Sequence, residues 1–194
     1  MIRDWQKYFQ LTKDRPPSVL LQKAVGFVVT KNLALDLGAG GLKDSKYLLE
    51  QNFKKVVAVD QEQIPSEMID LLDKTRFQFI RSSFDKFIFP VKTVDLINAQ
   101  FSLPFVSQND FDAVWSNIIN ALSPKGVFVG QFFGIRDEWN SGELDMTFHT
   151  IEQVRGLVKD LGTIEFSEEE KEKPLANGDL KHWHIFHIIV RAKD

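Results

Sequence analysis

A glycine-rich segment stands between a short apolar run and a polar run with helical spacing. The apolar residues Leu33–Leu37 lead into Gly38 and Gly40, and the polar segment begins at Lys43. Glycines let the backbone approach a ligand closely, and the start of the next helix offers free N–H groups and a positive dipole end. An ordinary strand-to-helix turn would give the same pattern. The segment by itself leaves both interpretations open.

An acidic residue on the next apolar run favours the ligand-binding interpretation. Asp60 follows Val56–Val59 and stands 20 residues after Gly40. A carboxylate at this place can accept hydrogen bonds from both hydroxyls of a ribose, although it could instead cap a helix. A dinucleotide-binding motif would also need a glycine at position 43, where this sequence has lysine. We therefore predict a nucleoside-containing cofactor, with a nicotinamide dinucleotide as the weaker alternative.

These residues must be positioned by β-α units, because short apolar runs alternate with amphipathic segments from Asn32 onward. We expect strands at Leu33–Leu37, Lys55–Val59, Phe77–Arg81, Val94–Ala99 and Val127–Phe133, and helices at Lys43–Gln51, Pro65–Asp73, Phe111–Leu122 and Thr150–Leu161. Two longer extended segments, Thr163–Glu170 and Lys181–Ala192, flank an Asn-Gly pair and predict an antiparallel hairpin. Before residue 32 the apolar spacing predicts two helices, separated by Pro16 and Pro17.

The segment Leu33–Ser45 resembles the first motif of class I S-adenosylmethionine-dependent methyltransferases, with Asp36, Gly38 and Gly40 at matching positions. Segments 80–87, 94–105 and 122–129 are similar to later motifs of the family, in the same order. The resemblance extends from Trp5 to the C-terminus and is closest to the small bacterial methyltransferases of the tellurite-resistance and trans-aconitate type. It implies an α/β fold, a Rossmann-like three-layer sandwich whose seven-stranded, mostly parallel sheet has an antiparallel C-terminal hairpin strand. We expect one domain, 1–194, in which residues 1–31 form helices that could cover the pocket and 32–194 form the core.

The resemblance also implies which residues bind the S-adenosylmethionine cofactor. By this resemblance, Asp36 binds the methionine end of the donor and Asp60 binds its ribose. Gln61, Ser83 and Phe84 contact the adenine, and Asn98 lies near the methyl group. With Gly38 and Gly40, these residues make up the predicted cofactor site.

The acceptor side carries weaker signals. Phe101 could face a sulfonium or an apolar substrate, Arg136 could hold a carboxylate, and Trp139 stands in the segment where substrate loops commonly hang. Our candidate general base is His149, which precedes a helix beside the expected substrate edge. Each of these side chains could instead belong simply to the core or the surface. A metal site is not expected, since strand alternation separates His187 from the other histidines of its strand and cysteine is absent.

Composition narrows the function further. The chain has 194 residues, no cysteine and a formal net charge of −3, which excludes disulfides and thiolate chemistry and argues against nucleic acid as a partner. No apolar run suits a membrane span or a signal peptide, so we expect a cytoplasmic enzyme that methylates a small molecule. The alternatives are a non-catalytic S-adenosylmethionine-binding protein and a nicotinamide-dependent oxidoreductase.

Overall fold

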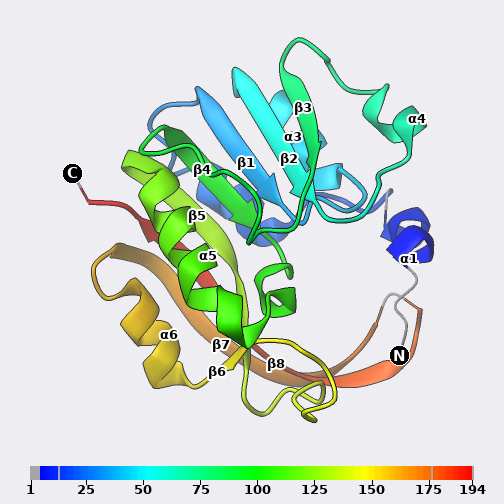
Figure 1. Ribbon diagram of the computed structural model, residues 1–194, viewed down its shortest axis with the longest axis vertical. Coiled ribbons are helices and arrows are strands. Elements are labelled where there is room, and N and C mark those ends of the chain that lie inside the picture. Colours follow the sequence, from blue (N-terminus) through cyan, green and yellow to red (C-terminus); the bar gives the residue numbers. More distant parts are fainter. Residues whose placement is uncertain (1–4, 13, 176, 194) are drawn as a thin grey trace.

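The computed structural model describes residues 5–12, 14–175 and 177–193, and its centre is one mixed β-sheet (Figure 1). The strands run in the order β3-β2-β1-β4-β5-β8-β7, and a short β6 pairs with β5. Their bounds are β1 Leu33–Leu37, β2 Lys55–Asp60, β3 Phe77–Arg81, β4 Val94–Ala99, β5 Leu122–Gly134, β6 Phe148–His149, β7 Gly162–Pro174 and β8 Leu180–Arg191. Strands β1 to β5 pair in parallel, whereas β8 is antiparallel to both β5 and β7. The predicted Rossmann-like sheet with an antiparallel C-terminal hairpin is confirmed, and β6 is an addition to it.

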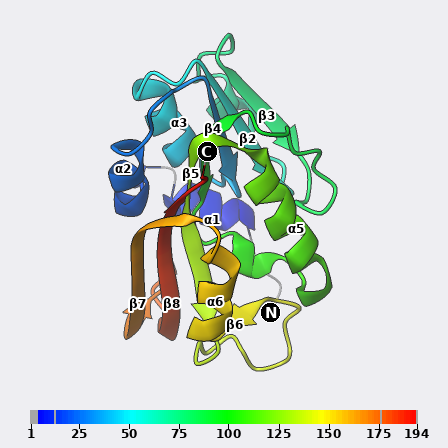
Figure 2. The same ribbon diagram turned by 90° about the vertical axis from the view of Figure 1, so that its left-hand side faces the viewer.

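Helices cover both faces of the sheet, as Figure 2 shows for α2 and α3 on one side and α5 and α6 on the other. The helices are α1 Trp5–Thr12, α2 Val19–Val25, α3 Lys43–Glu50, α4 Ser66–Ile69, α5 Gln108–Ala121 and α6 Ile151–Val158, with a 3-10 turn at Leu103–Phe105. Strand alternation divides the core, because Leu35 packs in the cluster of α5 and α6 while its neighbour Ala34 packs in the cluster of α2 and α3. Among the described residues, none of the helices has the length and apolar character that crossing a bilayer requires.

Helix α4 is shorter than the predicted Pro65–Asp73. None of its side chains is fully buried, and Leu71 beyond its end is 85% exposed, so only the partial packing of Met68, Ile69 and Leu72 holds this segment against the core. Helices α5 and α6 begin at side-chain caps, where Ser107 accepts a hydrogen bond from the backbone of Asp110, and Thr150 forms a capping box with Gln153.

The β7–β8 hairpin is longer than the sequence predicts. Strand β7 continues past Glu170 to Pro174, and the added residues pair with β8 from Trp183 to Leu180. At the tip, Gly178 adopts a φ of 95°, the left-handed conformation expected of the Asn-Gly turn. In Figure 1 the hairpin curves past the carboxyl ends of the parallel strands toward α1. Two segments far apart in the chain, α1 and the hairpin tip, therefore approach the same edge of the sheet.

Candidate active site

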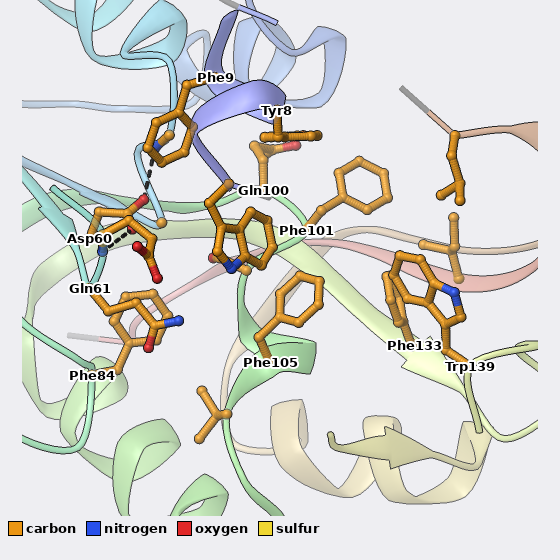
Figure 3. A pocket seen from close by; sticks show the side chains of 18 of the residues that line it. Tyr8, Phe9, Asp60, Gln61, Phe84, Gln100, Phe101, Phe105, Phe133 and Trp139 are labelled. Carbon is orange, nitrogen blue, oxygen red and sulfur yellow. Dashed lines mark hydrogen bonds between the residues drawn. The ribbon is translucent and has the colours of Figure 1, made fainter. Parts of the chain in front are cut away.

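A cavity of about 790 Å³ opens at the carboxyl ends of the parallel strands (Figure 3). The strand ends contribute Gly38, Asp60 and Gln100, α1 contributes Phe9, and β8 contributes Trp183. This edge is where open α/β sheets bind their ligands. Helix α1 lies against the cavity as a lid would, and whether it moves stays a prediction.

The glycine turn forms one wall of the cavity. Gly38 and Gly40 have φ angles of 74° and 48°, which glycine adopts without strain. A Cβ at Gly38 would stand 2.3 Å from the Cβ of Ser102, so no side chain fits there. The turn is specified by both its backbone conformation and the close approach of Ser102.

Asp60 ties this turn to the end of β2. Its Oδ2 accepts a hydrogen bond from the backbone N–H of Gly40 at 2.9 Å, and its Oδ1 accepts one from Glu62 at 3.0 Å. Burial raises the pKa of Asp60, and the backbone hydrogen bonds from Glu62 and Gly40 oppose that rise. Each carboxylate oxygen has a further lone pair, so Asp60 can still accept hydrogen bonds from a ligand in the cavity.

The other predicted adenine contacts share this end of the cavity. Gln61, Ser83 and Phe84 all line it. In Figure 3, Gln61 and Phe84 lie beside Asp60, on the side away from Phe133 and Trp139. The structure therefore brings together six of the eight residues predicted for the cofactor.

The remaining two, Asp36 and Asn98, do not line the cavity. Asp36 accepts hydrogen bonds from Ser45 at 2.6 Å and from the Asn98 amide at 2.8 Å. Burial, reinforced by the charge of Asp44, raises the pKa of Asp36 to about 6. The carbonyl of Asn98 accepts a hydrogen bond from Gln100 at 2.8 Å, and Gln100 does line the cavity. Asp36 and Asn98 are therefore connected to the cavity only indirectly, through the hydrogen bond that Gln100 donates to Asn98.

Aromatic rings form the opposite end of the cavity. The ring centroids of Trp139 and Trp183 are 5.5 Å apart, and Phe133 lies 6.0 Å from Trp139 and 5.6 Å from Trp183. Phe101 lies 6.1 Å from Trp183, and Phe105 lies 6.2 Å from Trp139. All five rings line the cavity, so the predicted substrate residues Phe101 and Trp139 belong to one wall.

Phe101 stands where this wall meets the glycine end. Its φ of 54° is unusual for a large residue, and its N–H donates to the amide oxygen of Gln131 at 3.0 Å. The Gln131 amide nitrogen donates in turn to Gln100 at 2.9 Å. Strained backbone of this kind is characteristic of functional sites.

Comparisons with known proteins agree with this geometry. Residues 35–130 match the methyltransferase domain family. TehB from Haemophilus influenzae has a similar structure, with 16% identity and a TM-score of 0.73 over 97% of this chain and 67% of that one. A Haloferax volcanii methyltransferase, solved in complex with the Trm112 methyltransferase activator, gives 16% identity and a TM-score of 0.72 over 98% and 95% of the two chains.

A third similar structure contains ligands. It is the 1,6-didemethyltoxoflavin-N1-methyltransferase of Burkholderia thailandensis with bound 1,6-didemethyltoxoflavin and S-adenosylhomocysteine, at 16% identity and a TM-score of 0.66 over 98% of this chain and 84% of that one. No curated protein sequence matches the chain significantly. The family match and the fold agree. The chain is a class I S-adenosylmethionine-dependent methyltransferase. Its cofactor is S-adenosylmethionine. The glycine turn, where no side chain fits at Gly38, and the neighbouring carboxylate of Asp60 are suited to bind this cofactor.

Two residues predicted for the acceptor side of the methyltransferase also lie outside the cavity. Arg136 is held on the surface by Glu168 and Glu170 of β7, each at 2.8 Å. His149 packs against Phe111 and Phe132, with ring centroids at 4.6 and 5.4 Å, and lines a separate pocket of about 440 Å³ next to α5 and α6. Burial lowers the pKa of His149 to about 4. A carboxylate clamp or a base inside the main cavity must therefore be another group.

Among the polar residues that line the cavity without a role predicted from the sequence are Arg15 and His187. Strand alternation gave the signal for His187, because Trp183, Ile185 and His187 share a face of β8 and all three line the cavity. No sequence pattern singled out Arg15, which stands between α1 and α2. Within the described ranges, no cluster of three or more histidine, aspartate or glutamate side chains could hold a metal ion.

Proposed function

We propose that this methyltransferase transfers the methyl group of S-adenosylmethionine to a small organic acceptor bound against the aromatic wall. The observation that carries the proposal is that one cavity joins the glycine turn and Asp60 to the rings of Trp139 and Trp183. The Burkholderia thailandensis enzyme is also a small-molecule methyltransferase, solved with bound 1,6-didemethyltoxoflavin and S-adenosylhomocysteine. A donor and an acceptor could meet in this cavity without leaving the protein.

The donor belongs at the glycine end. We assign the ribose hydroxyls to Asp60 and the adenine to Gln61, Ser83 and Phe84, all of which line that end. The bound cofactor supplies a methyl group on a cationic sulfur, which a nucleophile attacks in line.

The donor's carboxylate calls for a cation, and among the described residues the arginine and lysine side chains that line the cavity are Arg15 and Lys173. Lys173 is paired with Glu169 at 3.4 Å. Arg15 lines the same cavity as Gly38 and Gly40, and we assign the carboxylate to it.

A proton must leave the acceptor when its nucleophile is a hydroxyl or an N–H group, and we assign that proton to His187. This residue lies opposite Gln131 in the β5–β8 register, next to the Gln131–Gln100 hydrogen bond at the junction of the two ends. Within the described part of the chain, the buried Nε2 of His187 has no hydrogen-bond partner, and the Glu169 carboxylate lies 3.8 Å from it. Burial lowers the pKa of His187, which keeps the imidazole neutral and able to accept a proton.

Isothermal titration calorimetry tests the proposal. We expect micromolar binding of S-adenosylhomocysteine and none of NADH, with binding strongly weakened in D60N and unchanged in D73N, a variant of an exposed carboxylate. Formation of S-adenosylhomocysteine with at least one member of a metabolite panel would then support turnover. Binding of NADH in place of S-adenosylhomocysteine would overturn the proposal. Donor binding with no turnover on any acceptor would favour a non-catalytic binding protein.

A further inference from the structure

A buried ion pair lies behind the aromatic wall. The ammonium of Lys181 donates to Asp137 at 2.5 Å, and the two side chains are 1% and 0% exposed. The Asp137 carboxylate also accepts hydrogen bonds from the backbone of Trp139 at 3.0 Å and of His184 at 3.2 Å. These contacts fix the pair at one place, although burying two charges costs solvation energy.

The rings of the wall lie against this buried ammonium. Lys181 Nζ is 3.9 Å from the ring centroid of Trp183, 4.5 Å from Trp139 and 5.4 Å from Phe133. An ammonium within about 6 Å of a ring centroid is attracted by the negative face of the ring. The same three rings line the cavity. Because they already attract the ammonium of Lys181, they have less attraction left for a cation in the cavity.

Resting on the proposed function, we propose that the acceptor is a neutral, planar aromatic molecule that packs against Trp139 and Trp183. The rings provide a large apolar contact area, and stacked or edge-to-face aromatic pairs add specific stabilisation. A cationic acceptor would meet rings that are already in contact with the ammonium of Lys181, and would gain less from their negative faces.

Among the described residues, the cations at this end are already paired with carboxylates, so an anionic acceptor has no free partner there. Lys181 is neutralised by Asp137, and Lys173, at the hairpin tip, is paired with Glu169. Burying a charge without a partner costs several kcal/mol more than burying an apolar ring. The wall therefore disfavours cations, because its rings already contact Lys181, and disfavours anions, because it does not compensate their charge.

Three probes of similar shape and different charge test this inference at pH 7.5: quinoline, 1-methylquinolinium and quinoline-6-carboxylate. Each is titrated into the protein saturated with S-adenosylhomocysteine, and binding is followed by quenching of tryptophan fluorescence. We expect quinoline to bind at least about tenfold more tightly than either charged probe, a difference of about 1.4 kcal/mol. Equal or tighter binding of a charged probe, or no binding of quinoline, would overturn the inference. Failure of S-adenosylhomocysteine to bind would instead count against the proposed function.

The double variant K181M/D137N removes both buried charges at similar volume. We expect its 1-methylquinolinium affinity to rise at least about fivefold relative to quinoline, because the ring faces regain their attraction for a cation. The matched control is K74M/D70N, which removes an exposed ion pair with side chains 67% and 60% exposed and leaves the preference unchanged. Calorimetry with S-adenosylhomocysteine verifies that the variant is folded. An unchanged charge preference in the folded variant would contradict the role of Lys181, and the comparison of probes on the wild type does not depend on the variant.

Discussion

Replacing Asp36 by asparagine should change the pH dependence of stability in a predictable direction. Burial and the charge of Asp44 raise the pKa of Asp36 from 3.8 to about 6, so the folded protein holds this proton more tightly than the unfolded chain does. The resulting stabilisation is complete below about pH 4 and is lost as the pH rises through about 6. At roughly 1.36 kcal/mol per pH unit, the loss amounts to about 3 kcal/mol.

The asparagine introduced by D36N should keep the local hydrogen bonds. Its carbonyl can accept from Asn98, and its amide can donate to Ser45, whose hydroxyl both donates and accepts. We therefore expect D36N to be as stable as the wild type at pH 4.5 or less stable, and to gain on it by about 2 kcal/mol between pH 4.5 and 7.5. Urea unfolding followed by tryptophan fluorescence at four pH values measures this difference. Parallel stability curves for the two proteins would refute the reasoning.

Three further predictions concern the site itself. D60N should weaken S-adenosylhomocysteine binding by about 1.5–3 kcal/mol, or roughly 10- to 150-fold by calorimetry, and an affinity equal to that of D73N would contradict this. G38A should cost about 1–3 kcal/mol more in thermal unfolding than G142A, because both positions have positive φ but only Gly38 lacks space for a Cβ; equal costs would exclude crowding. H187N should lower turnover on any acceptor found in the panel by roughly 10²- to 10⁴-fold without changing the affinity for S-adenosylhomocysteine, and full activity would rule out the base.

The regular part of the fold could be predicted from local patterns. Strands β1, β3 and β4 have the predicted bounds, because buried parallel strands are short apolar runs between polar segments. The extent of β7 could not be predicted in this way. Residues 171–174 are mostly charged, and they are extended because they pair with Trp183 to Leu180, a long-range contact.

The donor end of the site was predictable for a similar reason. Gly38, Gly40 and Asp60 follow directly from consecutive strand ends, so their spacing in the chain reports their proximity in space. The acceptor end depends on where the hairpin folds, which sequence spacing does not specify. Position along the chain therefore favoured His149 and Arg136 as acceptor-side residues. In the structure, His149 on β6 packs against Phe111 of α5, and Glu168 of β7 holds Arg136 outside the cavity.

Helix α1 shows the same limit. Its aromatic spacing predicted a helix, and Trp5, Tyr8 and Phe9 do line the cavity. The contact of Trp5 with Phe105, at a centroid distance of 5.3 Å, joins the helix to the aromatic wall. Local periodicity identified the helix, but only the tertiary structure shows which wall it extends.

A crystal structure with S-adenosylhomocysteine tests the two-ended cavity most directly. We expect the ribose hydroxyls on Asp60, the adenine between Gln61 and Phe84, and the sulfur directed toward open space in front of Phe101 and Trp183. Adenine packed against Trp139 and Trp183, or a ribose away from Asp60, would contradict it.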